Sequence, residues 1–270
     1  MTEEDYNKIY RFRLELEKAE MSSHIVKTEK IFMLNYKDAG NRSLFGGMTK
    51  LAENLHKKYC LVIIKMPLLR PAYRRKLHSY NRYVDYEKDS AKVDSAFEFR
   101  SGIEIAEALA LIHKLGYVHH DVRPENILVD SEGNFVLGDL ESVRLLSDQY
   151  DAHLQSSLQY RAPELDKRLP YGADIDVFAW GRSMVFILSM APPPGIRPDK
   201  VRTMLYDNGR TLYLSQGEGM PGITVQLFKD SSHKIPLALA AAKALSDNPA
   251  DRWRDGKELA EALADGSGAH

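Results

Sequence analysis

Apolar residues recur at three- to four-residue intervals along several stretches of this chain, a spacing typical of helices that bury one side. The helices predicted in this way span residues 3–20, 96–115, 173–189, 234–245 and 256–263. Short apolar runs bounded by polar turns predict strands at 31–34, 61–67 and 134–139, with a further short strand after residue 126. The two patterns together predict a protein of mixed α and β structure whose second half is mainly helical.

Two stretches carry weaker patterns. Between residues 36 and 58 an apolar stripe at helical spacing predicts an inserted helix, and the stripe consists of Leu44, Met48, Leu51 and Leu55. Packing within its own part of the protein is the preferred interpretation, and a partner-binding or pocket-covering helix is the alternative. Residues 196–232 carry several glycines and little periodicity, which predicts loops and short helices.

A basic segment follows the strand at 61–67. Its basic residues are interleaved with tyrosines, and the set comprises Arg70, Tyr73, Arg74, Arg75, Lys76, Tyr80, Arg82 and Tyr83. Aromatic rings among basic side chains can bind nucleic acid. The preferred interpretation is a solvated helix face, and nucleic-acid binding is the lesser alternative.

The overall composition excludes several classes of protein. The chain has 270 residues and a net charge of −1, so it offers no general electrostatic attraction to nucleic acid or a membrane. A single cysteine, Cys60, excludes an internal disulfide and favours a reducing compartment, the cytoplasm or nucleus. The acidic N-terminal residues lack an apolar core, so no signal peptide is expected. The most apolar stretch, 175–192, is interrupted by Asp176 and Arg182 and is interpreted as a buried helix.

The residues that carry chemistry centre on the stretch from 117 to 130. Asp121 and Asn126 are five positions apart across a turn that contains Pro124. That spacing lets a carboxylate face one side of a cleft while an amide oxygen faces a hard cation such as Mg²⁺. The adjacent histidines, His119 and His120, point apart and lack other His or Cys partners, so a metal site formed by them is not expected.

This stretch resembles the catalytic loop of eukaryotic-type protein kinases, H-R-D-x-x-x-x-N, with His120 in the position of the arginine. Further matches follow in the family's order. Asp139, Leu140 and Glu141 stand where the family has D-F-G, and residues 160–164 match the A-P-E end of an activation segment. Upstream of the strand at 61–67, neither a G-x-G-x-x-G loop nor a V-A-I-K-type lysine can be identified.

The resemblance implies roles for individual residues. Asp121 is expected to accept or orient the proton of the accepting hydroxyl, and Arg123 to offer positive charge to the phosphoryl group. Asn126 and Asp139 are the expected ligands of Mg²⁺. The residues expected to support the structure are Ser157 near Asp121, Asp176 behind the catalytic loop, and Glu164 paired with Arg252. The residues expected around an adenine are Ile63, Ile64, Met66 and Leu128.

The resemblance also implies a fold. We expect an α+β, two-lobed, protein-kinase-like fold with a truncated N-terminal lobe (residues 1–66), a complete and mainly helical C-terminal lobe (67–265) and a flexible tail (266–270). In the helix at 3–20, Arg13 occupies the position of the family's glutamate, and Glu15 and Glu17 are shifted candidates for it.

The expected function is that of a serine/threonine-protein-kinase-like protein that transfers the γ-phosphoryl group of ATP to a protein hydroxyl. ATP and Mg²⁺ are the expected cofactors, and a protein substrate or a regulatory protein is the expected partner, with no role for nucleic acid or a membrane. A pseudokinase that acts as a binding or regulatory module is the main alternative. A small-molecule kinase is the other, although such enzymes usually lack the A-P-E-bounded segment.

Overall fold

The chain divides into two compact units, which are described separately here. Residues 1–21 and 26–68 form the first unit, and residues 22–25 and 69–270 form the second. The computed structural model describes residues 3–19, 24–26, 30–34, 61–65, 69–76, 79–82, 97–148, 157–189, 202–206, 211–215, 223–226 and 234–265. The helix predicted within 36–58, Met66 and the tail at 266–270 lie outside the described residues.

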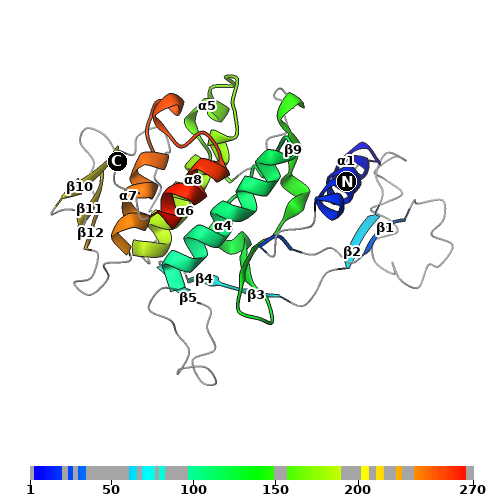
Figure 1. Cartoon of the computed structure of the whole chain (residues 1–270), viewed down its shortest axis with the longest axis horizontal. Coiled ribbons are helices and arrows are strands. Elements are labelled where there is room, and N and C mark those ends of the chain that lie inside the picture. Colours follow the sequence, from blue (N-terminus) through cyan, green and yellow to red (C-terminus); the bar gives the residue numbers. More distant parts are fainter. Residues whose placement is uncertain are drawn as a thin grey trace. The chain divides into compact units, whose positions relative to one another are not determined.

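The first unit contains one described helix and one described pair of strands (Figure 1). Helix α1 (Glu3–Lys18) buries an apolar stripe formed by Ile9, Phe12 and Leu16, which is the stripe that predicted it. Strands β1 (Lys30–Leu34) and β2 (Leu61–Lys65) pair antiparallel. Both strands coincide with the predicted ones to within two residues.

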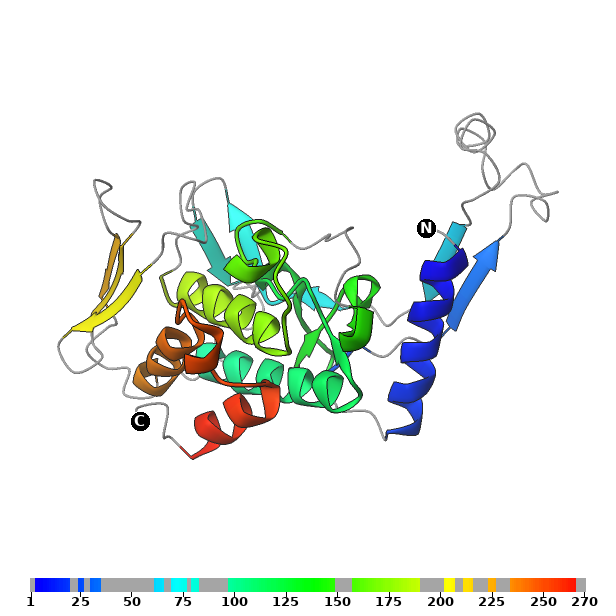
Figure 2. The ribbon, with the colours of Figure 1, turned by 90° about the horizontal axis from the view of Figure 1, so that it is seen from above.

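Helices form most of the second unit (Figures 1 and 2). They are α4 (Phe97–Lys114), α5 (Pro163–Asp166), α6 (Asp174–Ser189), α7 (Lys234–Ala244) and α8 (Gly256–Ala264). Helix α4 packs against α6 and α8, and α6 packs against α7. Trp180, fully buried in α6, donates its indole N–H to the carbonyl of Gly102 in α4 at 3.0 Å. This bond fixes the two central helices to each other in the core.

Small sheets and single turns position the segments between these helices. Strands β3 (Arg70–Pro71), β7 (Ile127–Val129) and β8 (Phe135–Leu137) form one sheet with β7 in the middle, and β6 (Tyr117–Val118) pairs with β9 (Arg144–Leu145). The 3₁₀ turns are η1 (Pro124–Asn126), η2 (Leu140–Ser142), η3 (Leu146–Asp148) and η5 (Pro249–Asp251). Because β7 pairs with β8, the loop before β7 and the loop after β8 lie side by side.

The prediction of a helix for the basic segment was wrong. Strands β4 (Tyr73–Lys76) and β5 (Ser79–Arg82) form an antiparallel hairpin there. The register places Tyr73 opposite Arg82 and Arg75 opposite Tyr80. Aromatic residues favour strands, and cross-strand pairs of this kind stabilise a hairpin, whereas the run of charged residues alone is compatible with a helix.

The prediction of loops and short helices for residues 196–232 was also wrong. Three antiparallel strands lie there, β10 (Arg202–Tyr206), β11 (Thr211–Ser215) and β12 (Ile223–Gln226), with β11 in the middle. Each strand contains β-branched or aromatic residues, which favour a pleated surface. The strands are short and the glycines between them obscured the pattern.

No helix within the described ranges combines the length and the apolar character that a membrane span requires.

Candidate active site

A buried carboxylate at the start of α6 holds the backbone of residues 119 and 120. Asp176 Oδ2 accepts a hydrogen bond from the N–H of His119 at 2.6 Å, and Asp176 Oδ1 accepts one from the N–H of His120 at 2.9 Å. His113 Nε2, from α4, donates to Oδ2 at 3.0 Å. His120 has a φ of 70°, which lies in the left-handed region of backbone conformation that residues other than glycine rarely adopt. Asp176 therefore stabilises an unusual backbone conformation immediately before Asp121.

The ionisation of Asp176 makes this arrangement depend on pH. Burial alone would raise its pKa, but the hydrogen bond from His113 and neighbouring charge outweigh burial, and the pKa of Asp176 lies below its ordinary value. A carboxyl group with a depressed pKa stabilises the fold above its unfolded pKa of about 3.9, and that stabilisation is lost as the pH falls through the lower folded-state pKa.

We therefore expect Asp176→Asn to reduce the free energy of unfolding by about 2–3 kcal/mol near pH 7, because a charge-assisted acceptor is lost. The reduction should shrink below about pH 4, because the carboxyl group of Asp176 binds a proton in the unfolded state from about that pH, whereas in the folded state it does so only at its lower pKa. Urea unfolding of both proteins across this pH range measures the difference. A difference that stayed constant from pH 7 to pH 3 would contradict the assignment of a stabilising charge to Asp176.

The carboxylate of Asp121 lies between two hydrogen-bond donors. Its Oδ1 accepts from the backbone N–H of Ser157 at 3.0 Å, and its Oδ2 accepts from Asn126 Nδ2 at 3.1 Å. Asp121 is buried, with 8% of its surface exposed. The two bonds hold the carboxylate in one orientation and leave each oxygen able to accept a further hydrogen bond.

Asn126 and Asp139 lie together at the side of the site that the sequence predicted for a metal. Asn126 Nδ2 donates to the backbone carbonyl of Asp121 at 2.8 Å and lies 3.4 Å from Asp139 Oδ2. Because the amide group is planar, its oxygen is directed away from Asp121. Asp139 has a φ of 58° and a ψ of 53°, a left-handed conformation, and its carboxylate lies beside the amide of Asn126.

This donor set fits a divalent hard cation. One carboxylate and one amide oxygen are ligands that Mg²⁺ accepts, and Mg²⁺ commonly completes its coordination with water and the phosphates of a substrate. Within the described residues, no cluster of three or more His, Cys, Asp or Glu side chains could hold a metal by itself.

Glu141, which stands where the family has a glycine, adds a negative charge close to Asp139. Partial burial and the charge of Asp139 raise the pKa of Glu141 above its ordinary value. The two carboxylates thus repel each other, and a cation held at Asp139 would reduce that repulsion.

Arg123 lies beside Asp121 and is held by two partners. Its Nε donates to Glu125 Oε2 at 3.0 Å and its Nη2 lies 3.0 Å from Glu125 Oε1, so the pair is bidentate. Its Nη1 donates to the hydroxyl of Ser157. Burial would lower the pKa of Arg123, but the hydrogen bonds and charge of Glu125 raise it above its ordinary value. The guanidinium is therefore a fixed positive charge that bridges the loop at 119–126 and the segment at 157.

His119 links the loop of Asp121 to the segment of Asp139. Its Nε2 lies 2.8 Å from the carbonyl of Gly138, and its Nδ1 accepts from the N–H of Asp121 at 3.3 Å. A carbonyl oxygen can only accept, so the hydrogen resides on Nε2. His119 is fully buried and is therefore a bridge between the two acidic segments.

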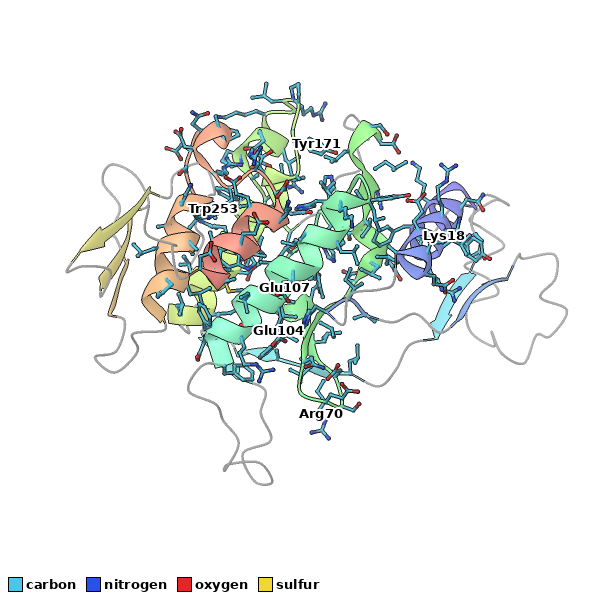
Figure 3. All side chains as sticks on the ribbon, in the orientation of Figure 1. Lys18, Arg70, Glu104, Glu107, Tyr171 and Trp253 are labelled. Atoms are coloured by element: carbon cyan, nitrogen blue, oxygen red, sulfur yellow. The ribbon has the colours of Figure 1, made fainter. Side chains whose placement is uncertain are left out.

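His120 replaces the family's arginine with a ring that makes no ion pair with any of the residues that the structure describes. Its Nε2 lies 3.0 Å from the hydroxyl of Tyr171, and the two rings meet edge to face at 5.3 Å. Burial lowers the pKa of His120 despite the nearby charge of Asp176, so the ring is neutral at neutral pH. Figure 3 labels Tyr171 near α5. A neutral His–Tyr contact thus stands where the resemblance would place a cation that binds a phosphorylated loop.

Glu164 and Arg252 form the ion pair that the resemblance implied. Arg252 Nη1 donates to Glu164 Oε1 at 2.6 Å, and Nη2 donates to Glu164 Oε2 at 3.0 Å, across 88 positions of sequence. Asp174 also accepts from Nη1, at 3.2 Å. Burial and the charge of Glu164 raise the pKa of Asp174, although Arg252 opposes the shift. The guanidinium is fully buried and lies 4.8 Å from the centroid of the Phe178 ring.

The residues predicted around an adenine are only partly described. Ile63 and Ile64 lie in β2 of the first unit, and Leu128 is half-buried in β7 of the second. Met66 lies outside the described residues. A G-x-G-x-x-G sequence at 217–222, between β11 and β12, also lies outside them, and no prediction was based on it. Adenine binding by these residues remains a prediction.

The structure reveals two supporting residues that the sequence analysis did not assign. His113 donates to Asp176 and accepts the N–H of Gly256 at 2.9 Å, so it joins α4, α6 and α8. Arg182 is buried in α6 and donates its Nε to the carbonyl of Gln159 at 3.1 Å. Burial lowers the pKa of Arg182 to about 10, so it stays charged at neutral pH. A charge inside an apolar helix was the signal available in the sequence for Arg182.

A comparison with protein-family models finds one match. Residues 77–231 match the model described as "Protein kinase domain". The match covers the loop of Asp121, the segment of Asp139 and the segment that ends at Glu164, and it therefore includes most of the site described above.

Comparisons with individual proteins find similar segments in larger proteins. The chain is 33% identical over 107 residues to the mitosis inhibitor protein kinase mik1 of Schizosaccharomyces pombe, covering 39% of this chain and 18% of that protein. It is 28% identical over 109 residues to the serine/threonine-protein kinase PAK 4 of Homo sapiens, covering 39% and 18%. It is 25% identical over 150 residues to the mitogen-activated protein kinase kinase kinase 17 of Arabidopsis thaliana, covering 54% and 39%. The chain thus spans well under half the length of each of these relatives.

Proposed function

Because the chain belongs to the protein kinase domain family, we propose that it transfers the γ-phosphoryl group of ATP to a serine or threonine hydroxyl of a protein. The observation that carries the proposal is the convergence of Asp121, Asn126 and Asp139 at hydrogen-bond distances, with Arg123 and Ser157 on the other side of Asp121. The similarity to serine/threonine-protein kinases supports the same reaction class.

The geometry of Asp121 suits the role of orienting the accepting hydroxyl. Ser157 and Asn126 fix the plane of the carboxylate, so the hydroxyl hydrogen that it accepts has a defined direction. Catalysis of phosphoryl transfer depends mainly on such positioning and on electrostatic stabilisation. Asp121 then receives the proton as the new O–P bond forms and the bond between the γ-phosphorus and the bridging oxygen of ADP breaks.

Positive charge for the transferring group comes from the chain itself at Arg123. Its guanidinium stays protonated and is held by Glu125 and Ser157, so little reorganisation accompanies the reaction. When Mg²⁺ is bound with the nucleotide, Asn126 and Asp139 are the residues that would hold it, and the ion would neutralise phosphate charge.

A reduced upper lobe is part of the proposal. The described residues of the first unit comprise α1 and the two-stranded sheet β1–β2. At the position where the resemblance places a glutamate in α1, Arg13 pairs with Glu17 at 2.6 Å within the helix. We infer that nucleotide contacts from this unit are fewer than in a complete upper lobe, and that affinity for ATP is correspondingly low.

Thermal unfolding with Mg²⁺ and ATP tests nucleotide binding directly. A ligand at 100 times its Kd raises the free energy of unfolding by about 2.7 kcal/mol, and each kcal/mol shifts the melting temperature by roughly 2–4 °C at this size. We expect a small but measurable rise, of at most about 2 °C, at millimolar Mg-ATP, and we expect Asp139→Asn to remove it.

The outcomes of that experiment are distinct. A rise of several degrees that Asp139→Asn removes would show that the upper half of the pocket is rebuilt by other residues and would contradict low affinity. No rise with or without Mg²⁺ would contradict the proposed ATP-dependent reaction. Transfer of labelled γ-phosphoryl to a serine-containing peptide by the wild type, compared with Asp139→Asn, completes the test.

A further inference from the structure

Two neighbouring residues of helix α6 reach the two segments that surround Asp121. Arg182 Nε donates to the carbonyl of Gln159 at 3.1 Å, in the segment opposite the loop of Asp121. The hydroxyl of Ser183 lies 3.4 Å from the carbonyl of Val122, which directly follows Asp121. The same part of α6 therefore contacts the chain on both sides of the Asp121 carboxylate.

The segment that Arg182 contacts is a single turn, residues 157–161. The last two N–H groups of this turn donate to the carbonyl of Ser157, at 2.9 and 3.2 Å. The N–H of Ser157 itself donates to Asp121 Oδ1 at 3.0 Å. Because two hydrogen bonds close the turn, an anchor at one of its residues also limits the position of the N–H group that binds Asp121.

The 157–161 turn also contacts the guanidinium of Arg123 at two points. The hydroxyl of Ser157 accepts from Arg123 Nη1, and the guanidinium carbon lies 6.0 Å from the centroid of the Tyr160 ring. Tyr160 is buried, with 2% of its surface exposed. A shift of this turn would therefore displace one donor to Asp121 and two contacts of Arg123 together.

The burial of Arg182 is unfavourable for a charged group. Arg182 is 2% exposed, and burial lowers its pKa to about 10, although the side chain of Tyr160 opposes the shift. An apolar side chain of similar length would fill the same space without the cost of removing a charge from water. The guanidinium adds a charge-assisted hydrogen bond to the carbonyl of Gln159. That bond distinguishes Arg182 from an apolar residue at the same position.

From these contacts we propose that Arg182 is a positioning residue for phosphoryl transfer, which holds the 157–161 turn against the loop of Asp121. The proposal rests on the proposed phosphotransfer function and adds a residue to its machinery. Arg182 acts through Ser157, whose N–H orients the Asp121 carboxylate and whose hydroxyl binds Arg123. Without this anchor the turn would sample more positions, and small displacements slow a reaction that depends on positioning.

Amide hydrogen exchange followed by NMR measures the anchor independently of catalysis. In R182M, the hydrogen-bonded N–H groups of the 157–161 turn should exchange about tenfold faster, because a charge-assisted bond no longer opposes local opening. The N–H groups of His119 and His120 should exchange at the wild-type rate, since Asp176 still accepts from both of them.

The kinetic effect should separate positioning from stability. In R182M, kcat for transfer to a serine-containing peptide should fall by roughly 10–100-fold, while the KM for ATP changes little. The melting temperature should stay the same or rise, because replacing a buried charge by an apolar side chain of similar size is often neutral or stabilising. R182K keeps a charged donor at this position and should recover part of the rate.

A matched control replaces another fully buried side chain of α6. Met184 has no N–H or O–H in its side chain to donate, and M184L nearly preserves its volume. Exchange in the 157–161 turn, kcat and the melting temperature should all stay close to their wild-type values in M184L. This variant measures how much a general change in the packing of α6 affects the site.

The outcomes separate the positioning role from the proposed function. Exchange in the turn that is as slow in R182M as in M184L would overturn the positioning role, and so would an unchanged kcat. A lower melting temperature with faster exchange at His119 and His120 would also overturn it, because Arg182 would then act through general stability. If the wild type transfers no phosphate but R182M loosens the turn alone, the anchor stands and the proposed function is overturned.

Discussion

Asp121→Asn should reduce phosphotransfer by about 10²–10⁴-fold, the range typical for loss of a positioned general base. The asparagine cannot accept the hydroxyl proton, and one of its two polar atoms becomes a donor that faces the N–H of Ser157 or the amide of Asn126. The rate of transfer to a serine-containing peptide at saturating Mg-ATP measures the loss. Because the change falls on the chemical step, kcat should fall more than the KM for ATP rises.

The control for this prediction is a charge-matched change at an exposed position. Asp265→Asn, at the end of α8, should leave the rate unchanged. Activity that survived in Asp121→Asn would show that the transfer originates from another site or another protein. A loss of activity accompanied by a large fall in melting temperature would instead show that Asp121 acts mainly through stability.

Arg252→Ala should lower the free energy of unfolding by roughly 3–5 kcal/mol, because removing one member of a buried pair leaves the other charge without compensation. The guanidinium is fully buried and donates to Glu164, Asp174 and the carbonyl of Ser246. Its removal therefore leaves two carboxylates without their positively charged partner. At roughly 2–4 °C per kcal/mol, the melting temperature should fall by about 10 °C. Urea unfolding gives the free energy itself.

A neighbouring arginine supplies the comparison. Arg254→Ala removes an exposed side chain whose partner, Glu258, lies one helical turn away at 3.1 Å, and such pairs contribute less than about 1 kcal/mol. A cost for Arg252→Ala as small as that for Arg254→Ala would show that the buried pair contributes little. The stability of the second unit would then depend mainly on other contacts.

Hydrophobic patterning predicted the long helices well. Helix α4 was predicted at 96–115 and spans Phe97–Lys114, and α6 was predicted at 173–189 and spans Asp174–Ser189. Both helices contribute apolar side chains to the core of the second unit. The information is local, because the residues that define the period also define the helix.

Periodicity failed where the pairing of short strands decides the structure. The hairpin β4–β5 was predicted as a helix, and β10–β12 as loops and short helices. Short strands have little pattern of their own, and their stability depends on cross-strand pairs that the local sequence does not specify. The basic residues of the hairpin are evident in the sequence, but the pairing of β4 with β5 and the position of β4 beside η1 are not.

What the sequence determined by itself is the set of chemical groups and their local spacing. Asp121 and Asn126 are five residues apart, so one turn brings the amide nitrogen within 3.1 Å of the carboxylate. The order of the motifs also implied the family, which the match over residues 77–231 shows. A short separation along the chain strongly limits the distance between two side chains, so a site of this kind can be predicted before the fold is known.

Only the tertiary structure decided how that turn is supported. Asp176 reaches the N–H of His119 across 57 residues, and Arg252 reaches Glu164 across 88. The resemblance implied these two contacts, but their geometry and the additional donor His113 follow from the packing of α4 against α6. Tertiary packing likewise gave His120 a neutral partner in Tyr171 and buried the charge of Arg182 in α6. Burial and partner distance set the energy of a polar group, and both depend on residues far away in the sequence.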